Sequence, residues 1–185
     1  MLQTKVNNAN YQEFYKSVYS IQTDSVDQLI DLSSYTDVPC VLIDCCGWHY
    51  KKLFPNNNII SIECVRTAKQ FKLSADYFDE LVDDRYVWPR LSVDRPVVVL
   101  DRSPLLKYQT LNEIENFLHT LIASYCPMGI ILRVNLLFIN DNRLEDRFYT
   151  LSKIRLNGYV LEKFYYDVEK LMLEIKFKST KIIDE

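Results

Sequence analysis

Three acidic residues stand at the ends of short apolar runs, and they are the clearest candidates for chemistry in this sequence. Asp44 ends CVLID, Glu63 ends IISIE and Asp101 ends PVVVLD. Ligands of open α/β sheets bind where the parallel strands end, so these carboxylates are expected at such an edge. A carboxylate there can accept hydrogen bonds from a sugar hydroxyl or take up a proton. The alternatives are structural: Asp44 and Asp101 can cap the turns that follow them, and Glu63 can be an ordinary exposed acid.

The residues directly after Asp44 decide whether a ligand fits at this edge. The chain continues CCGWHY, in which Cys45 and Cys46 are expected to face the core as inert thiols, because no basic neighbour would lower their pKa. Trp48 is predicted to be a packing residue, with stacking on an adenine or another base as the sharper alternative. His49 is predicted at the surface or half-buried, and a general base is its alternative role.

The elements that would hold these acids follow from the hydrophobic pattern. Short apolar runs predict buried strands, and alternating segments near the C-terminus predict an antiparallel pair. The predicted strands are Cys40–Asp44, Ile59–Glu63, Pro96–Asp101 and Gly129–Ile139, a short one near ELVD, and a hairpin of 160–167 and 171–178. Helical spacing separates most of them. We therefore predict an α/β fold, a single-domain open and mostly parallel sheet with helices on both faces and a C-terminal antiparallel hairpin.

The first half of the chain is expected to contain helices around the first strand. Apolar spacing predicts one or two helices within 10–34 and another over 65–80, and YKKLFPNNN predicts a turn of the chain. Residues 1–36 are thus predicted to be a helical segment packed on a domain of residues 37–185.

Two helices are expected in the second half of the chain. Thr110 and Glu113 form a capping box, T-x-x-E, in front of apolar residues at helical spacing. A last helix is expected to begin at Asp141 or Asn142 and to end at Gly158, acting as its C-terminal cap.

Composition narrows the class of protein. The chain has 185 residues, 48% hydrophobic and 25% charged, with a formal net charge of −3, which fits a soluble globular domain without a general attraction for nucleic acid. No apolar run approaches the roughly 18 residues of a membrane span, and the N-terminus has no signal-peptide pattern. The five cysteines are an odd number without metal spacing, so we expect free thiols, no zinc site and a cytoplasmic location. The richness in Asn, Ile, Lys and Tyr is typical of an AT-rich genome, such as a viral one.

The order of elements and the three acids resemble the class I S-adenosylmethionine-dependent methyltransferases, over about residues 37–178. The resemblance implies a Rossmann-like sheet and S-adenosylmethionine as cofactor. It places Asp44 directly before the loop that binds the cofactor, which contains Gly47 and Trp48. It implies that Glu63 accepts hydrogen bonds from the ribose hydroxyls of the cofactor. It also puts Asp101, which begins DRSP, beside the reactive methyl group.

The loop itself departs from the family pattern D-x-G-x-G-x-G. Its glycine positions carry Cys46, Trp48 and Tyr50 here, and the whole chain has three glycines where average usage would give about 13. Glycine lets the backbone lie against the cofactor, and side chains add bulk there. Trp48 or Tyr50 is therefore expected to occupy the pocket, so that S-adenosylmethionine binds weakly or not at all, while Glu63 persists as a surface carboxylate. Aligning GW with the GGW of ribose 2′-O-methyltransferases instead requires a shortened loop.

The same subgroup of methyltransferases uses a Lys-Asp-Lys-Glu tetrad. Asp101 resembles its Asp, and Glu174, in the last predicted strand, resembles its Glu. The second lysine position offers Arg133 or Asn135, which do not exchange protons readily. Lys16, far before the first strand, is no evident counterpart of the first lysine.

Two functions follow from these observations. The favoured one is a methyltransferase-like protein that has lost tight cofactor binding and serves as a protein-binding or assembly unit. The alternative is an active methyltransferase with S-adenosylmethionine as its cofactor. One form of this alternative is an enzyme that methylates the ribose 2′-hydroxyl of RNA. Aromatic residues at 77–88 and 164–168 favour a protein partner over nucleic acid, because few basic residues lie among them. No membrane partner is expected.

Overall fold

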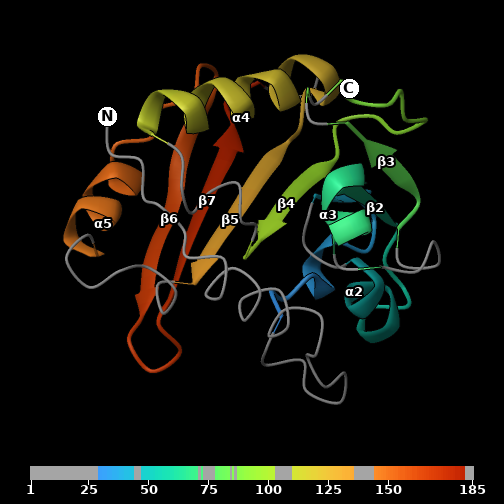
Figure 1. Ribbon diagram of the computed structural model, residues 1–185, viewed down its shortest axis with the longest axis horizontal. Coiled ribbons are helices and arrows are strands. Elements are labelled where there is room, and N and C mark those ends of the chain that lie inside the picture. The colour runs from blue at the N-terminus through green and yellow to red at the C-terminus, as the bar shows by residue number, and fades with distance from the viewer. Residues whose placement is uncertain are drawn as a thin grey trace.

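The computed structural model describes residues 29–43, 47–70, 72, 78–83, 85, 87–102, 110–135 and 144–181, and every structural statement here refers to these residues. They form a sheet flanked by helices (Figure 1). Among them, no helix combines the length and the apolar character needed to cross a membrane.

The sheet has seven strands in the order β3-β2-β1-β4-β5-β7-β6. The strands are β1 (Cys40–Ile43), β2 (Ile59–Cys64), β3 (Glu80–Val82), β4 (Val97–Asp101), β5 (Gly129–Asn135), β6 (Tyr159–Asp167) and β7 (Met172–Ser179). The first five run parallel, whereas β7 runs antiparallel to both β5 and β6. The predicted fold class and terminal hairpin are confirmed, with strand ends shifted by one or two residues. The part of the fourth predicted strand after Asn135 lies outside the described residues.

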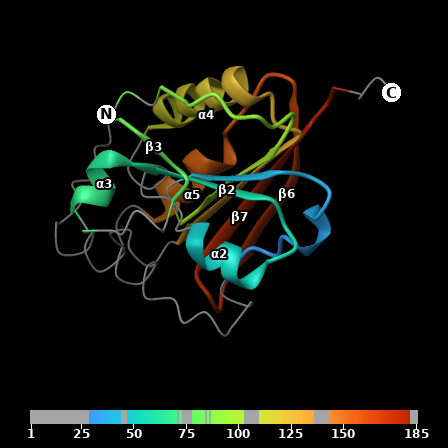
Figure 2. The ribbon, with the colours of Figure 1, turned by 90° about the vertical axis from the view of Figure 1, so that its right-hand side faces the viewer.

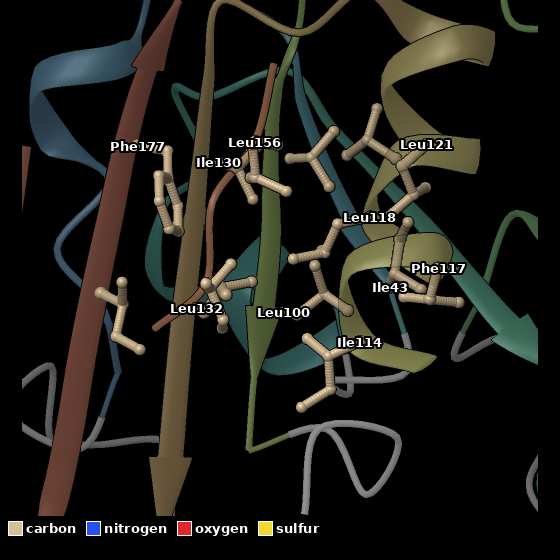
Figure 3. Close-up of a cluster of buried hydrophobic side chains, with 14 of the residues drawn as sticks. Ile43, Leu100, Ile114, Phe117, Leu118, Leu121, Ile130, Leu132, Leu156 and Phe177 are labelled. Atoms are coloured by element: carbon tan, nitrogen blue, oxygen red, sulfur yellow. The ribbon is translucent and has the colours of Figure 1, made fainter. Parts of the chain in front are cut away.

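Two hydrophobic clusters hold the sheet, one on each face. On one face, α4 (Leu111–Tyr125) packs on alternate residues of the central strands (Figure 3), and α5 (Leu144–Ser152) joins the same cluster. On the other face, α2 (Gly47–Leu53) and residues 29–35 cover β1, β4 and β5. Figure 2 shows α4 and α2 on opposite sides of the sheet. Central strands are apolar on both sides for this reason, as the unbroken run VVVL in β4 indicates.

The predicted capping box at the start of α4 is confirmed. The Thr110 hydroxyl accepts from the backbone N–H of Glu113 at 3.2 Å, and the Glu113 carboxylate accepts from the Thr110 N–H at 3.4 Å. Each bond satisfies a backbone donor that the first helical turn leaves without a partner.

Two local predictions near β1 were wrong in part. The turn predicted at YKKLFPNNN lies at 54–58, whereas residues 50–53 belong to α2, since the chain is already helical at Gly47. Residues 29–32 are irregular and are followed by the short 3-10 helix η2 (Ser33–Tyr35), where an α-helix was expected to continue to residue 34. The cause is a tertiary hydrogen bond, because the Ile30 N–H donates to Tyr50 Oη at 3.0 Å and not to a helical carbonyl. Residues 10–28 of that prediction lie outside the described residues.

Two helix ends also differ from the prediction. The helix expected over 65–80 is α3 (Val65–Gln70), and Glu80 belongs to β3 because Asp79 exchanges hydrogen bonds with the backbone of Ser61 in β2. α5 ends at Ser152, and the Lys153 N–H donates to the Thr150 carbonyl at 3.1 Å, which tightens the last turn. Gly158, with φ +82°, lies in the turn before β6 and does not cap α5.

The described cysteines are free thiols. Cys40 and Cys64 are buried, and burial raises the pKa of Cys40 to about 11, while Cys126 is exposed at the end of α4. Cys45 and Cys46 lie outside the described residues, so the prediction of five free thiols stays a prediction for them. No group of three or more His, Cys, Asp or Glu side chains suited to a metal ion occurs in the described part of the chain.

Candidate functional site

The candidate site lies where the parallel strands end, and Asp101 is at its centre. Asp101 is the last residue of β4, is 1% exposed and stands in register with Arg133 of β5. Arg133 donates from Nε to Asp101 Oδ1 at 2.7 Å and from Nη2 to Oδ2 at 2.8 Å. Two parallel charge-assisted bonds give the pair both strength and a fixed orientation.

Tyr50, which belongs to α2, contacts the carboxylate of Asp101 from a different side than Arg133. Its side chain has 0% exposure, and its hydroxyl donates to Asp101 Oδ2 at 2.5 Å. The Tyr50 hydroxyl oxygen in turn accepts a hydrogen bond from the backbone N–H of Ile30 at 3.0 Å. Tyr50 therefore joins α2, the end of β4 and the segment that precedes β1 through one hydroxyl group.

Arg102 completes what we call the Asp101 network, which consists of Asp101, Arg102, Arg133 and Tyr50. Arg102 Nη2 lies 3.2 Å from Asp101 Oδ2, and the Arg102 N–H donates to the carbonyl of Arg133 at 2.7 Å. Burial alone would raise the pKa of Asp101. The charges of Arg102 and Arg133 and the hydrogen bonds from Arg133 and Tyr50 outweigh burial and lower this pKa to about 2. Asp101 is thus a buried carboxylate with both oxygens occupied, and at neutral pH it is a poor general base.

Glu174 stands on the other side of Arg133. The register across β4, β5 and β7 places Asp101, Arg133 and Glu174 in one row. Burial would lower the pKa of Arg133, but the charges of Asp101 and Glu174 raise it, so the guanidinium stays charged. Glu174 also pairs with Lys163 of β6, at 3.3 Å between Nζ and Oε2. The two acids predicted as catalytic therefore flank Arg133, and their catalytic roles stay predictions.

A cavity of about 750 Å³ opens beside this row. Its walls come from residues 29–36, from the end of α2 with the turn after it, and from the part of the β6–β7 hairpin near Glu174. Charges of both signs line it, with Asp31, Asp167 and Glu174 against Arg133 and Lys170. The cavity is large enough for a small ligand but offers no field of one sign.

Glu63 lies in β2 and is 3% exposed, so the expectation of a surface carboxylate was wrong. Its neighbour in the register is Leu81 of β3, which extends the sheet beyond the point where β1 ends. The ribose-binding role of Glu63 stays a prediction.

The remaining predicted residues lie around the start of α2. His49 is 3% exposed, so the prediction of a surface or half-buried histidine was wrong; the first turn of α2 turns it inward. Gly47 and Trp48 begin this helix, and the side chain of Trp48 and the whole of Asp44 lie outside the described residues. Their roles in cofactor binding stay predictions.

Sequence reasoning missed the pairing of Tyr50 and Arg133 with Asp101. A signal existed for Arg133, since it is the one charged residue within the apolar strand GIILRVN, and a buried arginine needs an acidic partner. No comparable signal existed for Tyr50, because it was aligned with a loop position and is helical.

Comparison with known proteins rests on structure. No family model matches the sequence, and no curated protein sequence matches it. The fold is similar to human N-acetylserotonin methyltransferase solved with S-adenosylmethionine, with a TM-score of 0.53 and 16% identity over 98% of this chain and 61% of that one. The chain thus spans about three fifths of that protein.

Two shorter proteins are similar over their whole length. A TehB-like S-adenosylmethionine-dependent methyltransferase from Corynebacterium glutamicum has a TM-score of 0.52 and 11% identity, over 94% of this chain and 100% of that one. A chain of the Haloferax volcanii complex between the Trm112 methyltransferase activator and a methyltransferase has a TM-score of 0.54 and 9% identity, over 98% and 100%. With its sheet order and terminal hairpin, the chain has the fold of the class I S-adenosylmethionine-dependent methyltransferases.

Proposed function

We propose that this protein is a methyltransferase-like protein that has lost tight binding of S-adenosylmethionine and serves as a protein-binding or assembly unit. The observation that carries the proposal is the Asp101 network. The acid that would lie beside the reactive methyl is buried, paired with Arg133 and covered by Tyr50.

The network makes a ligand at this position costly. A ligand that contacts Asp101 must displace Tyr50 or Arg133, and breaking a buried ion pair on one side costs about 3–5 kcal/mol. Each 1.4 kcal/mol is a tenfold change in affinity, so the penalty is roughly 100- to 4,000-fold in the dissociation constant. Weak binding follows even if Glu63 keeps its ribose-binding role.

Exposed apolar side chains support a protein partner. Leu81 and Val87, at the β3 end of the sheet, are 45% and 69% exposed, and Tyr165 and Val168, at the β6 end, are 54% and 71% exposed. These positions fall in the two aromatic-rich stretches of the sequence. The similar Haloferax volcanii structure is a complex with a methyltransferase activator, so a protein partner is compatible with this fold.

Calorimetry with S-adenosylmethionine and S-adenosylhomocysteine tests the proposal. We expect no saturable heat for either ligand up to about 1 mM, and no rise in unfolding temperature, where a ligand at 100 times its dissociation constant would add about 2.7 kcal/mol. Glu63→Gln is the site variant and Glu80→Gln, on exposed Glu80 of β3, is its matched control. Micromolar binding that Glu63→Gln weakens and Glu80→Gln leaves intact would overturn the proposal.

One observation favours the active enzyme as a second candidate. The row sets Asp101 and Glu174, which resemble the Asp and Glu of the tetrad of ribose 2′-O-methyltransferases, on either side of a charged residue of β5, the strand expected to hold the second lysine. A test is transfer of a labelled methyl group from S-adenosylmethionine to a pool of short RNAs, with Glu174→Gln as the site variant. Incorporation that is lost in this variant would establish the second candidate.

A further inference from the structure

β6 forms one edge of the sheet (Figure 1), and apolar side chains lie exposed along it. Within the described residues, β6 pairs with β7 alone. Val160, Leu161 and Tyr165 are 52%, 48% and 54% exposed, and Val168 in the turn after β6 is 71% exposed. Edge strands of stable monomers are usually short or heavily charged, because their free backbone groups pair readily with another strand. β6 has nine residues, of which six are apolar or aromatic: Tyr159, Val160, Leu161, Phe164, Tyr165 and Tyr166.

Two opposite charges stand side by side in the middle of β6. A bulge between Leu161 and Lys163 inserts Glu162, and both charged side chains reach the same face of the sheet. Glu162 pairs with Lys176 of β7, and Lys163 pairs with Glu174, each at 3.3 Å. Both side chains keep a large exposed fraction, 41% for Glu162 and 46% for Lys163, so a second charge can still approach them.

The face of every other β6 residue follows from its partner on β7. Leu161, Phe164 and Tyr166 stand opposite Phe177, Ile175 and Leu173, which are buried in the core under α4 and α5. Val160, Lys163 and Tyr165 stand opposite Lys178, Lys176 and Glu174 and therefore lie on the other face. In an antiparallel pair, residues directly opposite each other point to the same face.

One antiparallel register of β6 with itself satisfies both the faces and the charges. A two-fold axis between Glu162 and Lys163 sets Glu162 opposite the second copy's Lys163, and the symmetry repeats this pair. The same axis sets Val160 opposite Tyr165 and Leu161 opposite Phe164, and each pair shares a face. A shift of one residue either way would set Glu162 against Glu162, or Lys163 against Lys163, which is destabilising.

We propose that a second copy of this chain pairs with β6 in this register, so that two sheets join into one. A lysine and a bulge on an edge strand ordinarily oppose pairing with unrelated strands. Here the adjacent Glu162 makes the same two features complementary to their own two-fold copy, which selects one partner and one register. Because a single strand from each copy makes the contact, the interface is smaller than the roughly 1,600 Å² of a standard one, and association is concentration-dependent. The inference is independent of cofactor binding, since it uses only the edge of the sheet.

Sedimentation of the full chain over about 2–200 µM tests the dimer. The wild type should shift from monomer to dimer across this range. Lys163→Glu should abolish the dimer, since Glu162 then meets a second glutamate, and Glu162→Lys/Lys163→Glu should restore it by exchanging the two charges. Lys69→Glu, on the exposed Lys69 of α3 far from β6, makes the same charge change and should leave the dimer intact. Circular dichroism checks that each variant is folded, because the swaps also alter the pairs with Glu174 and Lys176.

Cross-linking tests the register itself. In a Cys126→Ser background, Val160→Cys/Tyr165→Cys should form a covalent dimer on mild oxidation, whereas neither single cysteine faces itself across the axis. A wild type that stays monomeric throughout the range, a dimer unaffected by Lys163→Glu, or a single-cysteine variant that cross-links as fully as the double one would each overturn the proposal.

Discussion

Replacing either charge of the Asp101–Arg133 pair should destabilise the protein far more than replacing both. Asp101→Asn leaves two buried guanidinium groups, of Arg102 and Arg133, without their carboxylate, and Arg133→Met leaves the buried carboxylate without its bidentate partner. One-sided removal from a buried pair costs about 3–5 kcal/mol. With a urea dependence of about 2 kcal/mol per molar, the unfolding midpoint should fall by roughly 1.5–2.5 M in each single variant.

The double variant Asp101→Asn/Arg133→Met should cost clearly less than the sum of the two single variants, because the bidentate pair is removed as a whole and only Arg102 is left without the carboxylate. Urea unfolding followed by circular dichroism measures all four proteins. Asp83 and Arg85 form a matched control pair, at 2.9 Å but with side chains 47% and 83% exposed, and the corresponding variants should leave the midpoint nearly unchanged. Single-variant costs that add within about 0.5 kcal/mol would refute the coupling on which the closed site depends.

Two further predictions concern the same network. The pKa of Asp101 is about 2 in the folded protein, against an ordinary value of 3.8 when unfolded, so its contribution to stability is complete above about pH 4 and is lost as the pH falls through 2. The urea midpoint of the wild type should therefore fall more steeply over this window than that of Asp101→Asn, and parallel curves would contradict the assignment. Tyr50→Phe removes the hydroxyl that joins Asp101 to Ile30 and should cost about 1–3 kcal/mol, with faster hydrogen exchange at the Ile30 amide. Tyr149→Phe, on an exposed tyrosine, is its control, and unchanged exchange at Ile30 would count against the bond.

Apolar patterning predicted the sheet well, because central strands buried on both faces leave a strong local signal. The runs VVVL in β4 and GIIL in β5 are apolar on both faces and are therefore expected in the interior. Their strands, and the residues at the strand ends, could be found from the sequence for this reason. β3 gave a weak signal, since two of its three residues are exposed. The failures lie where tertiary contacts override local preference. Ile30 sits in an apolar helical pattern, yet its N–H bonds to a tyrosine twenty residues away.

The acidic residues of the candidate site could be predicted from the sequence, but the side chains that they contact could not. Asp101 and Glu174 were identified from strand ends and family resemblance, and the structure places them on either side of Arg133. Whether a carboxylate faces a ligand or an internal arginine depends on which side chains meet across strands, and sequence spacing does not specify such meetings. Arg133 and Tyr50 occupy both oxygens of Asp101, so this carboxylate does not face a ligand.

A buried ion pair needs a reason other than stability, because apolar side chains of similar volume often serve as well or better. The reason suggested by the contacts is placement of the segment before β1. Asp101 holds the Tyr50 hydroxyl, that hydroxyl holds the backbone of Ile30, and Leu29 and Ile30 are then buried against the sheet, at 6% and 4% exposure. A ligand that reached Asp101 would have to release Tyr50 and this segment together. Binding of S-adenosylhomocysteine at Asp101 and docking of residues 29–35 therefore exclude each other, and hydrogen exchange at Ile30 measured with and without the ligand reports both. Faster exchange with ligand would show that the closed state opens, whereas unchanged exchange at 1 mM ligand is the outcome that the network predicts.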